Sequence, residues 1–332
     1  MSIRSCVKLV LLTLTLLALV VIPCIAATKP YEVAVIIKAT DSDFWQFVLH
    51  GADGAVQELG PATVKLVYRG GPTSEADIDK QVAIVEDIVS KKPDAIVIAS
   101  TSSDATVPAL SRAAEMGIKI VMIDNKVHLK DEEFATFLAT NNLVGGALAA
   151  QELVKSIKAK GLPLKGRVSL ISAMAGVQVL MDREEGFITE LARIAPDLKL
   201  VPTRYVNNDI IQALAAAEDM LTTYPDLVGF FANNNHTGDG VSRAIIERNL
   251  HDKIAAVAYD SDPEEVEALK AGALDALVLQ DPYRMGYDGV MCAIGAIEGK
   301  AYGKFIDTGA NAITLENFHE DRAQQLLYPL SR

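Results

Sequence analysis

The segment Ala95–Ile123 reads AIVIASTSSDATVPALSRAAEMGIKIVMI, and within it two apolar runs enclose an amphipathic stretch. The runs Ala95–Ala99 and Ile118–Ile123 are short and rich in isoleucine and valine, which is typical of strands buried on both faces of a sheet. Between them, Asp104–Met116 has the length and the apolar spacing of a helix. The segment therefore predicts a strand–helix–strand unit with parallel strands, the building block of an α/β fold.

The same alternation extends in both directions. Around this segment it predicts the strands Glu32–Ile37, Thr63–Tyr68 and Ala135–Ala139 and the helices Trp45–Gly60 and Glu75–Lys92. A second series then predicts strands at 167–172, 199–206, 227–232, 254–259 and 276–279 and helices at 142–160, 182–194, 209–223, 237–248 and 263–271. Two successive series predict two doubly wound domains with parallel sheets.

No run of proline, glycine or serine separates the two series, so the junction between them must be short. We place it near Thr140–Leu143. The C-terminal part begins with a helix at Arg284–Gly299 and continues with short strands at Phe305–Thr308 and Ala312–Leu315. Periodicity alone does not assign these two strands to either domain.

The N-terminal segment has the order of a secretory signal. Arg4 and Lys8 precede an apolar run from Leu9 to Ile22, Pro23 breaks the run, and small residues follow up to Ala27. We therefore expect residues 1–27 to be a cleaved signal peptide and the protein to be exported. A permanent membrane anchor is disfavoured by the short apolar run. Lipidation of Cys24 is disfavoured because the residues before it match a lipoprotein signal poorly.

Composition excludes several classes of protein. The formal net charge is −12, and an acidic chain lacks the basic face that nucleic acids and anionic membranes require. Once residues 1–27 are removed, Cys292 is the only cysteine, so no internal disulfide is expected. The chain contains no nucleophile elbow, phosphate-binding loop or paired-histidine motif. We accordingly predict a binding protein rather than an enzyme, with no metal and no cofactor.

Polar side chains follow nearly every predicted strand, at the sheet edge where ligands of α/β proteins bind. These residues are Asp124, Asn125, Asn208, Asn234, Asp260 and Gln280. Planar carboxylates and amides suit vicinal hydroxyl groups, because each offers two hydrogen-bonding atoms. For any one of them taken alone, helix capping is the better explanation. Capping does not explain Arg183 or the aromatic pair Phe44 and Trp45, and these favour a site for a hydroxyl-rich molecule such as a sugar or polyol.

Several short motifs occur in an order that resembles the periplasmic sugar-binding proteins of ABC importers, specifically the ribose-binding type. The resemblance covers essentially the whole chain after residue 27. The motifs are Asp43-Phe44-Trp45, Asp124, Asn141-Asn142 with Gly145-Gly146, Arg183-Glu184-Glu185-Gly186-Phe187, Tyr224-Pro225-Asp226, Phe231-Ala232-Asn233-Asn234, Asp260 and Gln280.

The resemblance implies a set of ligand contacts. Phe44 and Trp45 fall on the two stacking aromatics of the family, and Ser42 falls where ribose-binding members have asparagine. Two positions depart, since Asn125 replaces an arginine and Asn208 a phenylalanine, which predicts a pentose other than ribose, a hexose or a linear polyol. The remaining polar contacts match in identity: Asp124, Arg183, Asn234, Asp260 and Gln280.

The resemblance also implies the architecture and the partners. Two lobes joined by a three-segment hinge are expected, with residues 28–141 and 281–308 in the N-terminal lobe and residues 142–280 and 309–332 in the C-terminal lobe. Ligand closes the lobes, and the closed, monomeric protein delivers it from the periplasm to a membrane permease.

Three alternatives remain open at this point. The closed complex signals through a chemoreceptor or sensor kinase instead of a permease. A sugar-responsive repressor shares the fold, but it would need a DNA-binding segment where this chain has a signal sequence. A secreted carbohydrate-active enzyme would use carboxylates such as Asp41, Asp43 or Asp262 as acid and base.

Overall fold

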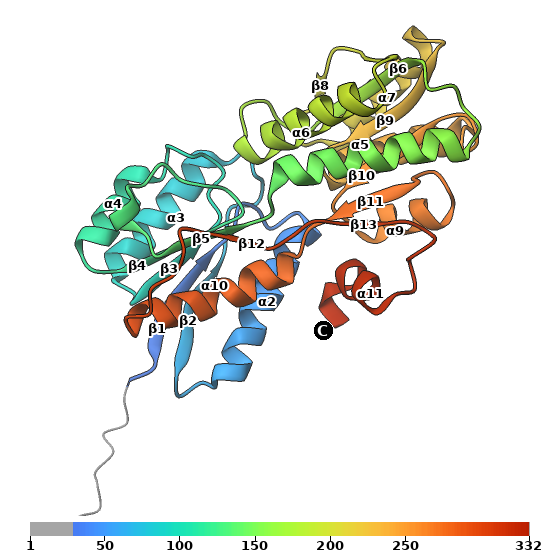
Figure 1. Ribbon diagram of the computed structural model, residues 1–332. Helices are drawn as coiled ribbons and strands as arrows, with labels where there is room; N and C mark the ends of the chain where they lie inside the picture. The colour runs from blue at the N-terminus through green and yellow to red at the C-terminus, as the bar shows by residue number, and fades with distance from the viewer. Residues whose placement is uncertain (1–28, 332) are drawn as a thin grey trace, which may run out of the picture.

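The computed structural model describes residues 29–331 and shows two α/β lobes side by side (Figure 1). The first lobe is built on a six-stranded sheet whose strands are all parallel, in the order β12-β5-β4-β3-β1-β2. Its strands are β1 (Tyr31–Ile36), β2 (Val64–Gly70), β3 (Ala95–Ile98), β4 (Lys119–Ile123), β5 (Thr136–Ala139) and β12 (Phe305–Asp307).

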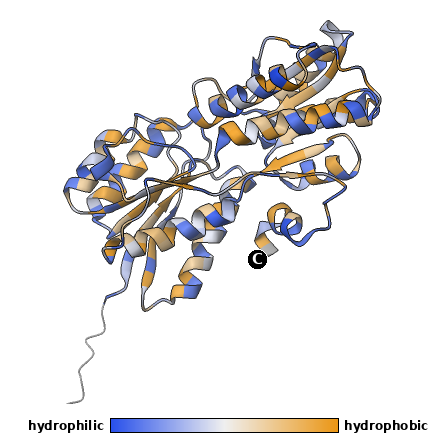
Figure 2. Cartoon of the chain, in the orientation of Figure 1, coloured by the Kyte–Doolittle hydropathy of each residue, from blue (hydrophilic) through white to orange (hydrophobic). Residues whose placement is uncertain are grey.

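Helices cover both faces of this sheet. Alternate residues of β1 point to opposite faces, so Val33 and Val35 join one core while Ala34 and Ile36 join the other. The first core is closed by α2 (Asp43–Leu59) and α10 (Pro282–Ile297), the second by α3 (Ile78–Lys91) and α4 (Val107–Glu115). Figure 2 shows the resulting pattern of apolar strands inside and helices with mixed faces outside.

The second lobe has a seven-stranded sheet in the order β13-β11-β10-β9-β6-β7, with β8 paired to β6. Its strands are β6 (Gly166–Ser172), β7 (Leu198–Leu200), β8 (Arg204–Tyr205), β9 (Leu227–Ala232), β10 (Ala255–Tyr259), β11 (Ala276–Leu279) and β13 (Asn311–Ile313). All pair in parallel except β13, which runs antiparallel to β11 at the sheet edge.

Six helices cover the second sheet. One face carries α5 (Asn142–Ala159) and α6 (Gln178–Ile194). The other face carries α7 (Ile210–Thr223), α8 (Asn235–Glu247), α9 (Pro263–Lys270) and α11 (Asp321–Leu327).

The chain passes between the two sheets three times. It leaves the first sheet after β5, returns to it after β11, and leaves it again between β12 and β13. On its return it forms α10, which packs beside α2 on the first sheet (Figure 1). The predicted α/β fold with two parallel-sheet lobes is therefore confirmed.

Some elements differ from the predictions. The extended segment predicted at 199–206 is two short strands, β7 and β8, because Pro202 between them has no N–H to donate to the sheet. Helix α6 begins at Gln178, earlier than the predicted Asp182. Helix α11 and the short 3₁₀ helices η1 (Asp131–Glu133) and η2 (Pro329–Ser331) were not predicted.

Helix α5 packs closely on its neighbours because of two glycines. A Cβ at Gly145 would lie 2.1 Å from the hydroxyl of Tyr259, and one at Gly146 would lie 2.0 Å from the carbonyl oxygen of Arg183. Neither position therefore has room for a side chain. Among residues 29–331, no helix has both the length and the apolar character to cross a membrane. The predicted signal peptide and Cys24 lie outside the described residues.

Candidate functional site

A cavity of about 40 Å³ lies between the two lobes, at the carboxyl ends of the central strands. It brings together eight of the ten residues that the sequence predicted for the site. The first lobe contributes Lys38, Ser42, Phe44, Trp45, Glu75 and Asp124. The second lobe contributes Ala173, Met174, Val177, Val179, Leu180, Arg183, Asn234, Asn235, Asp260 and Gln280.

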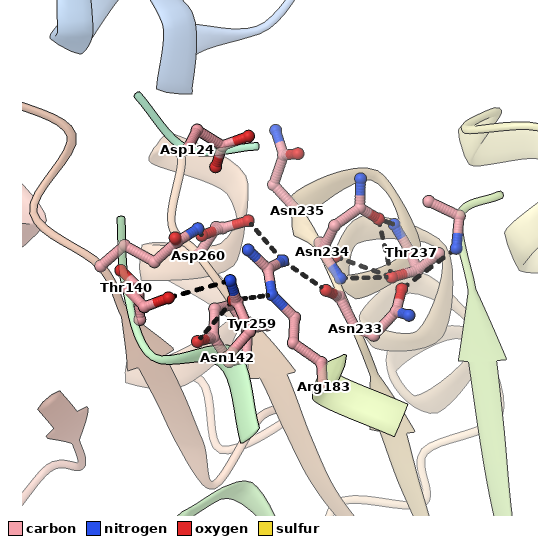
Figure 3. A network of polar contacts seen from close by, with 12 residues as sticks. Asp124, Thr140, Asn142, Arg183, Asn233, Asn234, Asn235, Thr237, Tyr259 and Asp260 are labelled. Carbon is pink, nitrogen blue, oxygen red and sulfur yellow. Dashed lines mark hydrogen bonds and ion pairs between the residues drawn. The ribbon is translucent and has the colours of Figure 1, made fainter. Parts of the chain in front are cut away.

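Arg183 is the centre of the polar network on the second lobe (Figure 3). Its Nε donates to Oδ1 of Asn142 at 2.8 Å, and its Nη1 donates to the carbonyl oxygen of Asn233 at 2.8 Å. Nη1 also forms an ion pair with Asp260 at 3.5 Å. The guanidinium lies over the ring of Tyr259, 3.8 Å from its centroid. These contacts hold a buried cation in one orientation, with its charge directed at the cavity.

Asp260 follows strand β10 with a left-handed backbone, at φ 78°. Its Oδ1 accepts a hydrogen bond from Nε2 of Gln280 at 2.6 Å. Burial raises the pKa of Asp260, and the positive charge of Arg183 opposes the rise. Oε1 of Gln280 is buried and has no hydrogen-bond partner within the described chain. An acceptor is therefore left for a hydroxyl group.

The first lobe has its own buried ion pair, between Lys38 and Asp124. Nζ of Lys38 lies 2.6 Å from Oδ2 of Asp124. Asp124 follows β4 and also has a left-handed backbone, at φ 62°. The sequence reading missed Lys38, which directly follows the apolar run of β1. A charged residue at the carboxyl end of a fully buried strand was the signal that could have identified it.

The aromatic pair lies in the first turn of α2. The rings of Phe44 and Trp45 meet edge to face, with 4.8 Å between centroids. Nε1 of Trp45 donates to Oε1 of Glu75 at 2.7 Å, which fixes the indole. Glu75 was also missed, because nothing in its loop distinguishes it from a solvated carboxylate. Ser42 precedes α2 but its side chain makes no capping hydrogen bond, so its hydroxyl is not used by the helix.

Two predicted residues do not line the cavity. Asn125 is buried beside it and donates a hydrogen bond to Oγ of Ser103 at 3.4 Å. Asn208 supports a neighbour, because its Oδ1 accepts from Nδ2 of Asn234 at 2.7 Å. Asn234 also caps α8, where its side chain accepts from the backbone N–H of Thr237. Asn234 therefore both caps α8 and lines the cavity.

An apolar wall completes the cavity, and no sequence pattern predicted it. Val177, Val179 and Leu180 pack together with Ala173 and Met174 in a small cluster, distinct from the cores of the two lobes. The wall comes from the β6–α6 loop and the first turn of α6.

The cavity lining carries both charge signs. Lys38 and Arg183 each pair with a carboxylate, and Glu75 adds one further negative charge. No serine–histidine or cysteine–histidine pair lines the cavity. In the part of the chain that the structure describes, no cluster of histidine, cysteine and carboxylate side chains is arranged to hold a metal ion. The arrangement offers hydrogen-bond donors and acceptors with an aromatic and an apolar surface, which suits binding.

Comparison with known families decides the relationship. A family model described as a periplasmic binding protein domain matches residues 33–301. The chain belongs to the periplasmic binding protein family. Within it, the D-allose-binding periplasmic protein of Escherichia coli (strain K12) is 28% identical over 270 residues, covering 80% of this chain and 84% of that protein.

Solved structures of the family agree with this assignment. A carbohydrate transporter solute binding protein from Agrobacterium radiobacter, in complex with D-arabinose, has a TM-score of 0.85 and 36% identity over 90% of this chain and 99% of its own. An ABC transporter solute binding protein from Agrobacterium vitis with bound D-fucose has a TM-score of 0.81 and 34% identity over 90% of this chain and 100% of its own.

These comparisons confirm the predicted resemblance to sugar-binding proteins of ABC importers, the ribose-binding type included. The family serves transport rather than catalysis, and its curated relatives include periplasmic proteins.

Proposed function

We propose that this periplasmic binding protein captures a neutral sugar between its lobes and delivers it, unchanged, to a membrane permease. One observation carries the proposal: two buried ion pairs, Lys38–Asp124 and Arg183–Asp260, line one cavity together with the aromatic pair of α2. Carboxylates held this way accept hydrogen bonds from hydroxyl groups, and aromatic faces pack against C–H surfaces. The D-arabinose and D-fucose complexes of similar proteins support the same ligand class.

The proposed contacts are the eight predicted residues that line the cavity, together with Lys38 and Glu75. Asn125 and Asn208 act behind them, Asn208 through its hydrogen bond to Asn234. Because each cation already has a carboxylate partner, an anionic sugar would bring an uncompensated charge into a buried site.

Binding proceeds by hinge motion in this proposal. Residues of both lobes line the cavity and bury it between them. A ligand therefore enters only when the lobes separate. The hinge is formed by the three chain crossings, with residues 28–141 and 281–308 moving against residues 142–280 and 309–332. Ligand that contacts both lobes favours the closed arrangement.

Export and assembly complete the proposal. Residues 1–27 direct the chain to the periplasm and are removed. The mature protein works as a monomer, performs no catalysis and presents its closed form to the permease.

Trp45 provides the test, because it is the only tryptophan in the chain and it lines the cavity. Mature protein is titrated with pentoses, hexoses and linear polyols while tryptophan fluorescence and the melting temperature are followed. We expect one ligand class to change the fluorescence saturably and to raise the melting temperature. If no sugar or polyol changes either signal, the proposed function is wrong.

Asp260→Asn tests the site. Asparagine keeps the shape and tolerates a left-handed backbone, but it removes the charge, and hydrogen bonds to charged groups contribute about 1.5–3 kcal/mol each. We expect at least a roughly tenfold loss of affinity, together with a lower melting temperature because Arg183 loses its buried partner. Asp275→Asn is the matched control, since Asp275 is a partly buried aspartate of the same lobe that pairs with Lys160 outside the cavity. It should lower the melting temperature and leave the affinity unchanged.

A further inference from the structure

The cavity lining combines two kinds of surface that differ in chemistry. Buried ion pairs and amides form one of them, while Val177, Val179, Leu180 and Met174 belong to the apolar wall defined above. Each of the first three is about 93% buried, at 7% relative exposure. The wall belongs to neither core of the second lobe, so the sheet does not need these side chains to be covered. What these side chains share is that they line the cavity.

Val177 is an unusual residue for its place in the fold. It is the N-cap of α6 and makes no side-chain capping bond. Serine, threonine, aspartate and asparagine are strongly preferred at this position, because their side chains accept a hydrogen bond from the first turn. The N-caps of the other helices around it follow that preference: Asn141 for α5, Asp209 for α7, Asn234 for α8 and Asp262 for α9. A valine here sacrifices helix stability and keeps hydrogen-bonding groups out of the wall.

A hydroxyl group that meets such a wall loses its hydrogen bonds to water and gains none in return, which is unfavourable. A methyl group or a hydrogen atom at the same place loses nothing and adds buried apolar surface. Among common aldoses in the pyranose form, the exocyclic carbon is the position that varies in this way. It is absent in pentoses, a methyl group in 6-deoxyhexoses and a hydroxymethyl group in hexoses.

We propose that the apolar wall selects sugars without a terminal hydroxymethyl group, so that 6-deoxyhexoses and pentopyranoses bind in preference to the parent hexoses. This inference rests on the proposed function of sugar binding. It names Val177, Val179 and Leu180 as specificity-determining residues, whereas the ion pairs recognise the ring hydroxyls that all three sugar types share.

The test uses matched sugars, so that only the exocyclic carbon differs. Three series are titrated by calorimetry: L-arabinose, D-fucose and D-galactose; D-xylose, 6-deoxy-D-glucose and D-glucose; D-ribose, 6-deoxy-D-allose and D-allose. In the series whose ring configuration binds, we expect the 6-deoxyhexose or the pentose to bind at least about tenfold more tightly than the hexose, the scale expected for one buried hydroxyl left unpaired. A hexose that binds as tightly as its 6-deoxy form overturns the inference while leaving the proposed function intact. Absence of binding in all three series also overturns the inference, whereas the proposed function fails only if the wider titration of sugars and polyols described above is negative as well.

Variants then locate the selectivity. Val177→Ser and Leu180→Asn place hydrogen-bonding groups in the wall and should shift the affinity ratio towards the hexose by several-fold. Val177→Ser also supplies the missing helix cap, so loss of fold does not explain its effect. Met181→Asn is the control, because Met181 neighbours Leu180 on α6 but is 44% exposed and lies outside the cavity. An unchanged ratio in both wall variants would remove the wall from the explanation.

Discussion

Two aspartates in strained backbone conformations carry the negative charges of the ion pairs in the cavity. Asp124 and Asp260 each follow a buried strand with positive φ, a region that costs energy for residues other than glycine. In both cases the turn directs a carboxylate at a cation, Lys38 or Arg183. The strained backbone of each aspartate therefore places its carboxylate beside the cation. Removing either residue of a pair leaves the other as a buried, unpaired charge.

Lys38→Met tests this dependence for the first lobe. Removing the cation leaves the buried carboxylate of Asp124 without its partner, and breaking a buried pair in this way costs about 3–5 kcal/mol. We expect the free energy of unfolding, measured by urea denaturation at pH 7, to fall by roughly that amount. The double variant Lys38→Met/Asp124→Asn removes both charges and should recover most of the loss. A double variant that is no more stable than the single one would show that the pair does not matter for stability.

The place of a single residue in the fold could be predicted where its position in the sequence was informative. Asp124, Arg183, Asp260 and Gln280 were found from the sequence because they follow strands or match a family motif, and they line the cavity. Lys38 escaped notice because lysine usually lies in water, and only its tertiary pairing with Asp124 shows that it is buried.

At the scale of elements, helix starts were the least predictable feature. The sequence suggested that α6 begins at Asp182, because aspartate is a common helix-capping residue. The helix instead begins at Gln178 after an uncapped valine. Val177 lines the cavity although a polar residue is preferred at the N-cap. No pattern within the helix reveals that this position faces the cavity. The strands, by contrast, were predictable because burial on both faces leaves continuous apolar runs.

Helices α8 and α9 share a group of buried carboxylates behind the cavity. Burial, followed by the neighbouring charges of Asp262 and Glu264, raises the pKa of Asp239 in α8 to about 8. Burial, followed by Asp262 and Asp239, raises the pKa of Glu265 in α9 well above its ordinary value. Asp239 therefore holds a proton at neutral pH that the unfolded chain releases.

The stability of these helices should consequently depend on pH. The folded state binds more protons than the unfolded state between the unfolded pKa of about 4 and the folded pKa of about 8. Stability contributed by Asp239 is therefore full below pH 4 and falls as the pH rises, by up to about 1.4 kcal/mol per unit. Asp239→Asn should be more stable than the wild type at pH 8 and show a flatter dependence of melting temperature on pH from 5 to 8.

Glu267→Gln, at an exposed position of α9 with 72% side-chain exposure, serves as the control for that experiment and should keep the wild-type slope. If Asp239→Asn also keeps it, Asp239 is ionised in the folded protein and the expectation is wrong.

At the scale of the whole molecule, a second groove lies across the two lobes. It measures about 460 Å³ and is lined by Asp43 of α2, by Asp262 at the start of α9 and by residues 327–330 near the C-terminus. Burial raises the pKa of Asp262, and the negative charge of Asp43 in the other lobe contributes to the rise. The two like charges oppose approach of the lobes.

Asp43→Asn should therefore favour the closed arrangement and tighten ligand binding. Because apparent affinity scales with the population of the binding-competent form, we expect an increase of about two- to fivefold, seen mainly as slower dissociation. Stopped-flow fluorescence of Trp45 measures the rate. Asp41→Asn is the control, because Asp41 lies just before α2 but outside the groove. Unchanged or weaker binding by Asp43→Asn would mean that this repulsion does not influence closure.

The position of β12 has a consequence for the order in which the chain folds. A ribosome makes the protein from the N-terminus, yet the first sheet is completed only by Phe305–Asp307, and α10 covers its face only after residue 282. A growing chain that ends at Leu279 still exposes apolar side chains such as Val97 and Ile123, which α10 covers at Gly289. Contacts between such distant segments form slowly. The first lobe therefore reaches its final fold only after residue 307 has been made.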